Sequence, residues 1–499
     1  MPRILNLLEI KEADRLTIEN QGITSLELME RAANVFCGAF LQQFPNPGPG
    51  VVVCGPGNNG GDGLAIARIL HQLQIQVQVV LTCPKPQLSP DALANLKRLP
   101  KAIPILKTEP SKLISKIQTA SWLCDALLGS GINRPLELDF LAWVSAMNAF
   151  PGLRISVDIP SGLLSEMPPG TVAFSAHWTG TFHSPKLPFM FPSSQGKVGL
   201  FSVLNISLDE PAEPGDSVYW LVESDIKQRL KTRMRFSHKG TFGHALIIAG
   251  SLGKMGAAIL ATRALLRSGA GLVTVYAPRC GRDPVQTAVP EAMFLSDPEK
   301  EWLSEVPSLG KFQAIGIGPG IGTHPETATM LQKVLKRSVH PLVLDADALN
   351  MISDYKSLLK DLPLGSILTP HPKEFERLVG KSGTDYEVFQ KARAFARDKK
   401  VVLILKGAYT LICSPEGKAW FNSTGNQGMA TGGSGDALTG ILTSFLAQGY
   451  TPVDAALCGV YLHGLAGDLA LEKESMESLL PTDLIEYLGK AFKTVRNSV

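Results

Sequence analysis

Short apolar runs alternate with longer segments of helical periodicity along most of the chain. Val51–Cys54 is a run of the kind found in buried strands, and a glycine loop and an apolar helical pattern follow it. Further strands are expected at 77–81, 121–128 and 154–159, and helices at 9–21, 26–44, 90–99 and 138–150. This alternation predicts a parallel sheet with helices on both faces.

The pattern changes at 171–204, where short Thr, Val and Phe segments suggest a few closing strands, and the stretch 211–215 is the candidate linker. A second alternating series follows. Its expected strands lie at 244–250, 272–278, 314–318, 342–346, 366–369 and 401–406, its helices at 256–268 and 385–398, and a hairpin at 409–414 and 418–423. From 434 onward the pattern is mostly helical. We therefore expect two doubly wound α/β domains, 1–215 and 216–499.

Composition and charge narrow the class of protein. The chain has 44% hydrophobic and 19% charged residues, as ordinary soluble proteins do, and a net charge of +3 with no Lys/Arg run longer than two. We expect neither nucleic acid nor a membrane as a partner, because both favour basic clusters or long apolar runs. The seven cysteines are scattered without a Cys-x-x-Cys, which argues against a disulfide framework or a zinc site and fits a reducing cytoplasm.

The stretch 425–440 is dense in glycine and leads into an apolar helix. Gly432, Gly433 and Gly435 let backbone N–H groups face a bound anion at a helix start. Asp436 follows in the first turn, where it could accept a proton from a hydroxyl that attacks a phosphoryl group. The alternative is an ordinary glycine loop with a capping aspartate.

In the first domain, polar residues follow three predicted strands: 58–62, Asp125 with 129–131, and Asp158 with Ser161. The carboxyl ends of parallel strands meet at one edge of a sheet, so these groups could share one pocket. Oxygen atoms of Asn59, Asp125 and Ser161 suit a hard cation of low charge, and Asp158 is a candidate acid or base. Taken singly, each aspartate is better explained as a helix cap. Gly55-x-Gly57-x-x-Gly60 resembles a dinucleotide fingerprint, but the second strand ends without the acid that holds a ribose, so NAD-dependent redox chemistry is not expected.

In the second domain, four more polar segments follow predicted strands, at 318–322, 345–350, 369–374 and 406–410. Lys406 could contact nucleotide phosphates, and Tyr409 or Thr410 could flank an adenosine. His371, held between two prolines, could hydrogen-bond a substrate. The alternatives are a solvated edge lysine and a packed turn histidine. Asp347 and Asn350 could contact the substrate or support residues that do, and the alternative for them is a helix-capping role.

Three segments of the first domain, 58–64, 125–134 and 157–163, resemble the signature segments of the NAD(P)H-hydrate epimerase domain, which is a Rossmann-like three-layer sandwich. The resemblance implies that Asn59, Asp125 and Ser161 hold a potassium ion. The segment 181–186 departs from the family, which usually has a glycine before a lysine similar to Lys186. By the same resemblance, the residues that bind the hydrated nicotinamide nucleotide are Asn58, Asn59, Gly60, Gly61, Asp62, Gly129, Ser130, Gly131, Ile132, Asn133, Arg134, Pro135 and Asp158.

Residues 225–495 resemble the ribokinase-like ADP/ATP-dependent NAD(P)H-hydrate dehydratase. The resemblance implies that Asp436 deprotonates the ring hydroxyl for phosphorylation, that phosphate then leaves, and that Mg²⁺ accompanies the nucleotide. The fused order of domains resembles that of the bacterial and archaeal enzymes, and this resemblance implies ADP as phosphoryl donor. The hydrate would contact Ala257, Gly320, Gly322, His371 and Asp436, and the nucleotide Lys406, Gly407, Ala408, Tyr409, Thr410 and Gly435.

The two domains resemble enzymes for successive steps of one repair pathway. This agreement favours a fused epimerase and dehydratase that repairs NAD(P)H hydrates. We expect a cytoplasmic homo-oligomer. Two alternatives remain open at this point: a ribokinase-like kinase of a small vitamin precursor or sugar, and a first domain that only senses or binds a nucleotide.

Overall fold

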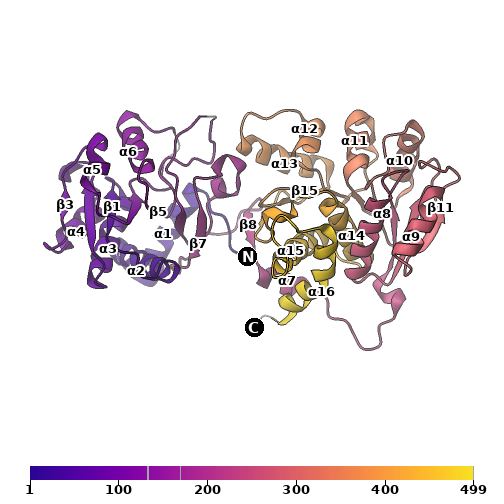
Figure 1. Ribbon diagram of the computed structural model, residues 1–499, viewed down its shortest axis with the longest axis horizontal. Helices are drawn as coiled ribbons and strands as arrows, with labels where there is room; N and C mark the ends of the chain where they lie inside the picture. The colour runs from indigo at the N-terminus through magenta and orange to yellow at the C-terminus, as the bar shows by residue number, and fades with distance from the viewer. Residues whose placement is uncertain (132–133, 169, 498–499) are drawn as a thin grey trace. The chain divides into compact units, whose positions relative to one another are not determined.

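The computed structural model describes residues 1–131, 134–168 and 170–497. The chain divides into two compact units. The N-terminal unit comprises Arg3–Pro214 with Gly383–Glu387, and the C-terminal unit comprises Met1–Pro2, Gly215–Ser382 and Val388–Val499. Each unit is an open sheet with helices packed on it (Figure 1).

The sheet of the N-terminal unit has the strand order β3-β2-β1-β4-β5-β6-β7, and every neighbouring pair within its described strands is parallel. The order reverses between β1 and β4, which creates a crevice at their carboxyl ends where ligands bind in such folds. The strands are β1 (Gly50–Cys54), β2 (Val77–Leu81), β3 (Ile105–Leu106), β4 (Trp122–Ala126), β5 (Leu153–Val157), β6 (Trp178–Phe182) and β7 (Leu200–Leu204). The helices are α1 (Leu7–Gln21), α2 (Ser25–Gln43), α3 (Asn58–Gln72), α4 (Pro90–Arg98), α5 (Leu113–Lys116) and α6 (Leu138–Asn148).

Strand β1 shows why this sheet is covered on both faces. Val52 and Cys54 pack in a core with residues of α2, α3 and α4, whereas Val51 and Val53 pack in a second core with α5 and α6. Side chains alternate along a strand, so a strand with two buried faces reads as a continuous apolar run. The side chains of Val51–Cys54 therefore contribute to the cores on both faces of the sheet.

The sheet of the C-terminal unit has the order β11-β10-β9-β12-β13-β14-β15-β16-β17-β8. It is parallel from β11 to β15, while β16 pairs antiparallel with both β15 and β17. Its order reverses between β9 and β12, which places a second crevice there. The strands are β8 (Val218–Leu221), β9 (His244–Ile248), β10 (Leu272–Ala277), β11 (Met293–Ser296), β12 (Ala314–Ile317), β13 (Leu342–Leu344), β14 (Ile367–Leu368), β15 (Val402–Leu405), β16 (Leu411–Cys413) and β17 (Ala419–Asn422).

Apolar helices cover one face of this second sheet. Helix α14 is buried along most of its length and packs with α8, α15 and α16 on strands β9 and β10 in one continuous core. The helices are α7 (Glu223–Arg229), α8 (Met255–Arg267), α9 (Arg282–Ala288), α10 (Pro325–Arg337), α11 (Ala346–Asp354), α12 (Pro372–Val379), α13 (Asp385–Lys399), α14 (Ser434–Ala447), α15 (Pro452–Ala470) and α16 (Pro481–Asn497). The core fixes the N-terminus of α14, which carries the glycine-dense stretch.

The expected fold class, two doubly wound α/β domains, is confirmed. The pattern did not reveal the short strands β3, β8 and β11. Strand β8 is the most consequential of these, because it pairs in parallel with β17 although it lies far earlier in the chain.

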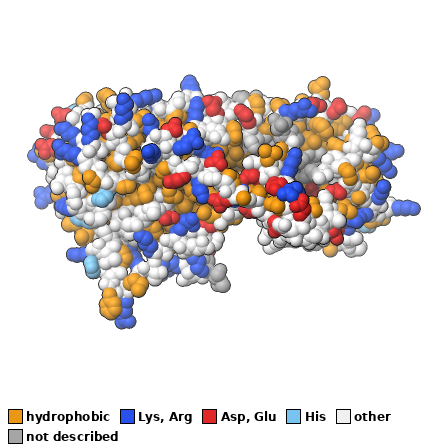
Figure 2. Space-filling view, turned by 180° about the vertical axis from the view of Figure 1, so that it is seen from behind, with side chains coloured by type: hydrophobic (Ala, Val, Ile, Leu, Met, Phe, Trp, Pro, Cys, Tyr) orange, Lys and Arg blue, Asp and Glu red, His pale blue; other side chains and the backbone are white. Residues whose placement is uncertain are grey.

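The surface agrees with the near-neutral composition. Basic and acidic side chains are interspersed over the face shown in Figure 2. Among the described residues, no helix is both long enough and apolar enough to cross a membrane.

Candidate active sites

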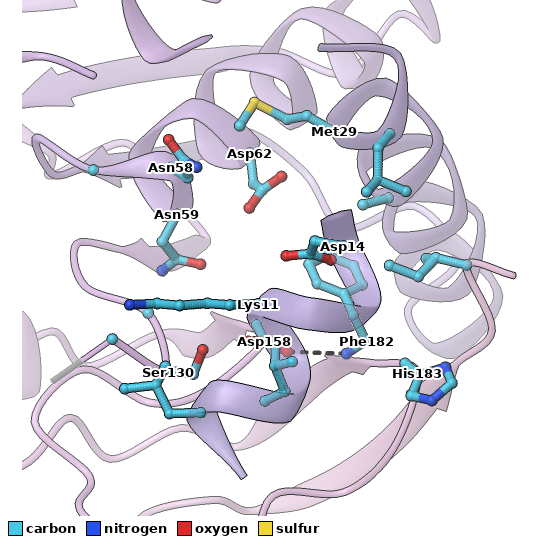
Figure 3. A pocket seen from close by; sticks show the side chains of 18 of the residues that line it. Lys11, Asp14, Met29, Asn58, Asn59, Asp62, Ser130, Asp158, Phe182 and His183 are labelled. Carbon is cyan, nitrogen blue, oxygen red and sulfur yellow. Dashed lines mark hydrogen bonds between the residues drawn. The ribbon is translucent and has the colours of Figure 1, made fainter. Parts of the chain in front are cut away.

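A cavity of about 530 Å³ opens at the crevice of the N-terminal unit. It is bounded by the loops after β1 and β4, by the segment after β5, and by helix α1 (Figure 3). Of the residues expected from the sequence to bind a ligand here, the cavity lining contains Asn58, Asn59, Asp62, Gly129, Ser130, Gly131 and Asp158. The three strand ends that the sequence pattern singled out therefore meet.

Gly60 and Gly61 lie behind this cavity. A Cβ on Gly60 would collide with the carbonyl oxygen of Gly55, and one on Gly61 would come within 2.8 Å of Met29 Sδ. The two glycines allow the first turn of α3 to pack tightly on its own loop and on α2. Their neighbours, not they, face the cavity.

Asp158 is held rigidly at the edge of the cavity. Its backbone has a φ of +62°, which is unusual for a residue with a side chain. Lys186 Nζ lies 2.8 Å from its Oδ1, and the backbone N–H of Phe182 donates to the same oxygen at 3.1 Å. A strained backbone at a charged, anchored residue is typical of a functional position.

Asp125 and Ser161 form a buried cluster next to the cavity. Ser161 donates to the Asp125 carboxylate through its backbone N–H at 2.7 Å and its hydroxyl at 2.6 Å. Asn59 joins the cluster through Leu128, whose carbonyl oxygen accepts from Asn59 Nδ2 at 3.0 Å and from Ser161 Oγ at 3.2 Å. Burial raises the pKa of Asp125 to about 6 in spite of these hydrogen bonds.

The remaining predicted residues of this unit lie elsewhere. Arg134 is exposed and pairs with Glu137 at 2.7 Å, and neither it nor Pro135 is part of the cavity lining. Ile132 and Asn133 lie outside the described residues.

A cavity of about 750 Å³ lies in the C-terminal unit, between the end of β15 and the N-terminus of α14. Its lining contains the predicted residues His371, Lys406, Gly407, Ala408, Tyr409, Thr410 and Gly435. Tyr409 packs edge-on against Trp220 of β8, with ring centroids 5.6 Å apart. The segment 406–410 and Gly435, which are expected to bind a nucleotide, therefore line the same cavity.

Helix α14 begins at this cavity without a capping side chain. Its N-cap, Gly433, has a φ of +98°, and a Cβ there would come within 2.6 Å of Leu260 Cδ1. Because no side chain occupies the N-cap position, N–H groups of the first turn such as those of Gly435 and Asp436 can face an anion. The helix start thus has the geometry of a phosphate site.

Asp436 lies in the first turn of α14 and is partly buried. Its pKa is raised to about 6, chiefly by burial and by the charge of Asp345, against the lowering effect of Lys406; Asp347 raises it further. Such a carboxylate is ionised at neutral pH yet close enough in pKa to accept a proton during a reaction.

Ala257, Gly320 and Gly322 lie at the second crevice, where the strand order reverses between β9 and β12. A Cβ on Gly320 would be 3.1 Å from the Cβ of Ala257, so the two are adjacent. The N–H of Gly322 donates to Asp347 Oδ2 at 2.8 Å. None of the three belongs to the lining of the 750 Å³ cavity, but Asp347 connects them electrostatically to Asp436.

His371 serves as the N-cap of α12. Its Nδ1 accepts from the N–H groups of Lys373 and Glu374, at 3.0 and 3.4 Å, so the ring proton is on Nε2, which lies 3.5 Å from Glu374 Oε1. Both interpretations weighed from the sequence are therefore compatible with its position: it caps a helix and it lines the cavity.

Comparison with known proteins adds a second line of argument. Residues 25–187 match the family model described as YjeF-related protein N-terminus, and residues 245–490 match that of NAD(P)H-hydrate dehydratase. The bifunctional NAD(P)H-hydrate repair enzyme of Thermofilum pendens is 32% identical over 99% of this chain and 97% of its own length. That of Coxiella burnetii is 35% identical over 96% of this chain and 97% of its own.

The chain belongs to the family of bifunctional NAD(P)H-hydrate repair enzymes. Among solved structures, the ADP/ATP-dependent NAD(P)H-hydrate dehydratase of Bacillus subtilis, co-crystallised with ATP and Mg²⁺, is 32% identical. The match covers 56% of this chain and 99% of the Bacillus subtilis chain, with a TM-score of 0.49. Membership of a family whose relatives extend over both units favours the repair enzyme over a kinase with a separate sensing domain.

Sequence reasoning missed several groups at the two sites of this repair enzyme. Lys11 and Asp14 reach the N-terminal cavity from α1, and His463 reaches the C-terminal one from α15. Burial lowers the pKa of His463 to about 4, so that it is neutral. The helical periodicity of 9–21 contained no sign that one face of α1 would line a cavity, because an exposed acid and a cavity acid look alike in a sequence.

Proposed function

We propose that the C-terminal site dehydrates the S form of NAD(P)H hydrate with ADP as phosphoryl donor, and that the N-terminal site interconverts the R and S forms. The products of the first reaction are NAD(P)H, AMP and phosphate. Together the two activities return both epimers to the usable coenzyme.

The position of Asp436 carries this proposal. Its charge interacts with Lys406, on the side of the 750 Å³ cavity, and with Asp347, on the side of Gly322. A base between a nucleotide site and a hydrate site is where a hydroxyl must be deprotonated to attack a phosphoryl group. The uncapped start of α14 and Lys406 would stabilise the phosphate charges.

The chemistry follows from the poor leaving ability of hydroxide. Asp436 takes the proton of the ring hydroxyl. At the same time the hydroxyl oxygen bonds to the terminal phosphorus of ADP, and AMP leaves. The carbon–oxygen bond then breaks with its electron pair on phosphate, the ring nitrogen donates its lone pair, and loss of a neighbouring ring proton restores the dihydropyridine. Phosphoryl transfer thus converts hydroxide into phosphate, a better leaving group.

Each site also implies a cation. Mg²⁺ bound to the nucleotide would neutralise phosphate charge, and it would enter with the nucleotide, because the described residues contain no group of three His, Cys, Asp or Glu side chains that could hold a metal alone. In the N-terminal unit, the buried carboxylate of Asp125 accepts from Ser161 and has no cationic partner among the described residues. Asn59 lies close by through Leu128, and oxygen atoms of these three side chains would suit K⁺.

At the N-terminal site, the hydrate would bind along the loop 58–62 and the segment 129–131, with Asp158 next to the ring. Asp158 is proposed to act as an acid or base on the hydroxyl-bearing carbon, in an orientation fixed by Lys186. We also propose that the protein works in the cytoplasm as a homo-oligomer. The seven cysteines, none in a disulfide, are compatible with a reducing compartment.

The test is to supply purified full-length protein with Mg²⁺, K⁺ and a mixture of both hydrates, with ADP or ATP as donor, and to follow the return of dihydronicotinamide absorbance. Complete conversion with ADP is expected. Recovery of only the S form would contradict the epimerase assignment, and a stable phosphorylated product would favour the kinase alternative. Faster recovery with ATP than with ADP would show that ATP is the preferred phosphoryl donor.

A further inference from the structure

The N-terminal cavity contains a carboxylate on α1 that the functional assignment has not used. Asp14 is half-buried, and it lines the same cavity as Asp62 and Asp158. The three acids come from different elements, α1, α3 and the segment after β5, and surround one space (Figure 3). Three carboxyl groups in one partly buried cavity repel one another when ionised, which lowers stability. Such an arrangement is typical of a functional site.

Asp14 differs from Asp158 in how it is held. Asp158 is anchored by Lys186 and by the N–H of Phe182. Within the described residues, the Asp14 carboxylate has no hydrogen-bond or ion-pair partner, so its open oxygen atoms can only be satisfied by water or by a ligand in the cavity. A bound substrate is therefore the natural partner of Asp14.

Inversion at the hydroxyl-bearing carbon explains why two acids are needed. The hydroxyl must leave from one face of the ring and return to the other. A single carboxylate whose orientation is fixed, as that of Asp158 is, serves one face. A second acid from a different element can serve the other.

The charges around Asp14 suit proton transfer. Those facing it are Lys11 on its own helix, Asp62, Asp158, His183 and Lys186. Burial and the Asp158 charge raise the pKa of Asp14 to about 6, against the opposing effect of Lys186 and His183. Asp62 is a weaker candidate, because burial and the charges of Asp158 and Asp14 raise its pKa well above the ordinary value and so favour its neutral form.

We propose that Asp14 is a second catalytic acid/base of the epimerase site, paired with Asp158 across the hydrated ring. In one direction, Asp14 donates its proton to the ring hydroxyl, the carbon–oxygen bond breaks with its electron pair on the departing water, and the ring nitrogen's lone pair forms a C=N⁺ bond. Water then adds to the other face of that carbon and gives its proton to Asp158. The roles exchange in the reverse direction, and the two acids exchange protons with solvent between turnovers, so nothing is consumed.

This inference rests on the proposed epimerase function, and the experiment separates the two. Pure S hydrate is incubated with full-length protein and K⁺ but no nucleotide, and formation of the R form is measured by chromatography after subtraction of the enzyme-free rate. Asp14→Asn is expected to lower kcat at least about 100-fold while KM changes only a few-fold. In the wild type, kcat should fall as pH rises through about 6, and this limb should be absent from the variant's residual rate.

Two controls keep the result interpretable. Glu19→Gln lies on the same helix with its side chain 57% exposed, and it should epimerise like the wild type. Dehydration of the S hydrate with ADP should be unchanged in Asp14→Asn, and so should the resistance of the N-terminal unit to limited proteolysis, which together show that both units are folded. If the wild type interconverts the epimers and Asp14→Asn retains kcat within threefold, the role of Asp14 is refuted. If the wild type does not interconvert them, the proposed epimerase function fails and this inference fails with it.

Discussion

Lys406 Nζ lies 2.8 Å from Oδ1 of Asp345, whose other oxygen accepts from Thr439 Oγ1 at 2.9 Å. Asp345 follows β13, Lys406 follows β15 and Thr439 is on α14. The pair thus connects two strand ends of the sheet with the helix that carries Asp436. It fixes the proposed base relative to the proposed phosphate site.

Replacing Lys406 with Met should therefore affect both stability and nucleotide binding. The buried Asp345 carboxylate would lose its cationic partner, at a cost of about 2 kcal/mol in the free energy of unfolding. KM for ADP should rise, because one phosphate contact is lost. Chemical denaturation and steady-state kinetics measure the two effects, and Lys493→Met, at an exposed position of α16, is the control. An unchanged KM would remove Lys406 from the nucleotide site.

Asp436→Asn should lower the dehydration rate at least about 100-fold and leave epimerisation unaffected, because an amide cannot accept the hydroxyl proton. The wild-type rate should depend on pH in a definite direction. Asp436 must be ionised to act as a base and its pKa is raised to about 6, so the rate should rise with pH through that value and be lost at lower pH. A dehydration rate near that of the wild type in Asp436→Asn would contradict the assigned role.

Gly440 tests the packing of α14 behind the turn that carries Asp436. A Cβ at this position would collide with the carbonyl oxygen of Ala261, where α14 lies against α8. Gly440→Ala should lower the free energy of unfolding by about 2–3 kcal/mol, since two backbones cannot separate without cost. Gly489→Ala is the matched control: it lies in α16 with no atom within 4 Å of the added Cβ, and it should stabilise the protein by about 0.5–1 kcal/mol. Thermal unfolding of both variants measures these changes, and a Gly440→Ala protein as stable as the wild type would contradict the predicted close packing of α14 on α8.

Potassium should stabilise the N-terminal unit in a pH-dependent way. The folded-state pKa of Asp125 is about 6 and its ordinary value is 3.8. The folded state therefore holds its proton more tightly, and the corresponding stability is present below about pH 4 and lost as pH rises towards 6. A bound cation would offset that loss. Replacing Na⁺ with K⁺ should raise the melting temperature more at pH 7 than at pH 4, and Asp125→Asn should abolish the difference between the ions.

Polar residues after apolar runs were the most informative signal in the sequence. Asn58, Gly129 and Asp158 could be expected to meet, because the carboxyl ends of parallel strands share an edge, and they line one cavity. Lys406 was expected from the same argument and Gly435 from the glycine-dense start of a helix, and these two also share a cavity. The roles of the predicted residues remain predictions until the variants above are measured.

Other features could not be read from the pattern, for physical reasons. Asp14 lies on a helix of ordinary amphipathic character, and only the path of the chain reveals that it faces a cavity. Gly60 serves backbone packing, although in a glycine loop it looks like a ligand contact. The ion pair between Asp345 and Lys406 joins residues far apart in sequence, which no local periodicity records.

The pairing of β8 with β17 has a consequence for biosynthesis. Residues 218–221 leave the ribosome about 200 residues before their partners at 419–422, so this edge of the second sheet cannot be completed until most of its unit has been made. Contacts of such sequence separation are slow to form and leave strand edges open in the meantime. The N-terminal sheet has no such requirement, because its strands lie within residues 50–204. We therefore expect this unit to acquire protease resistance on the ribosome while the nascent second unit is still open to cleavage and chaperone binding.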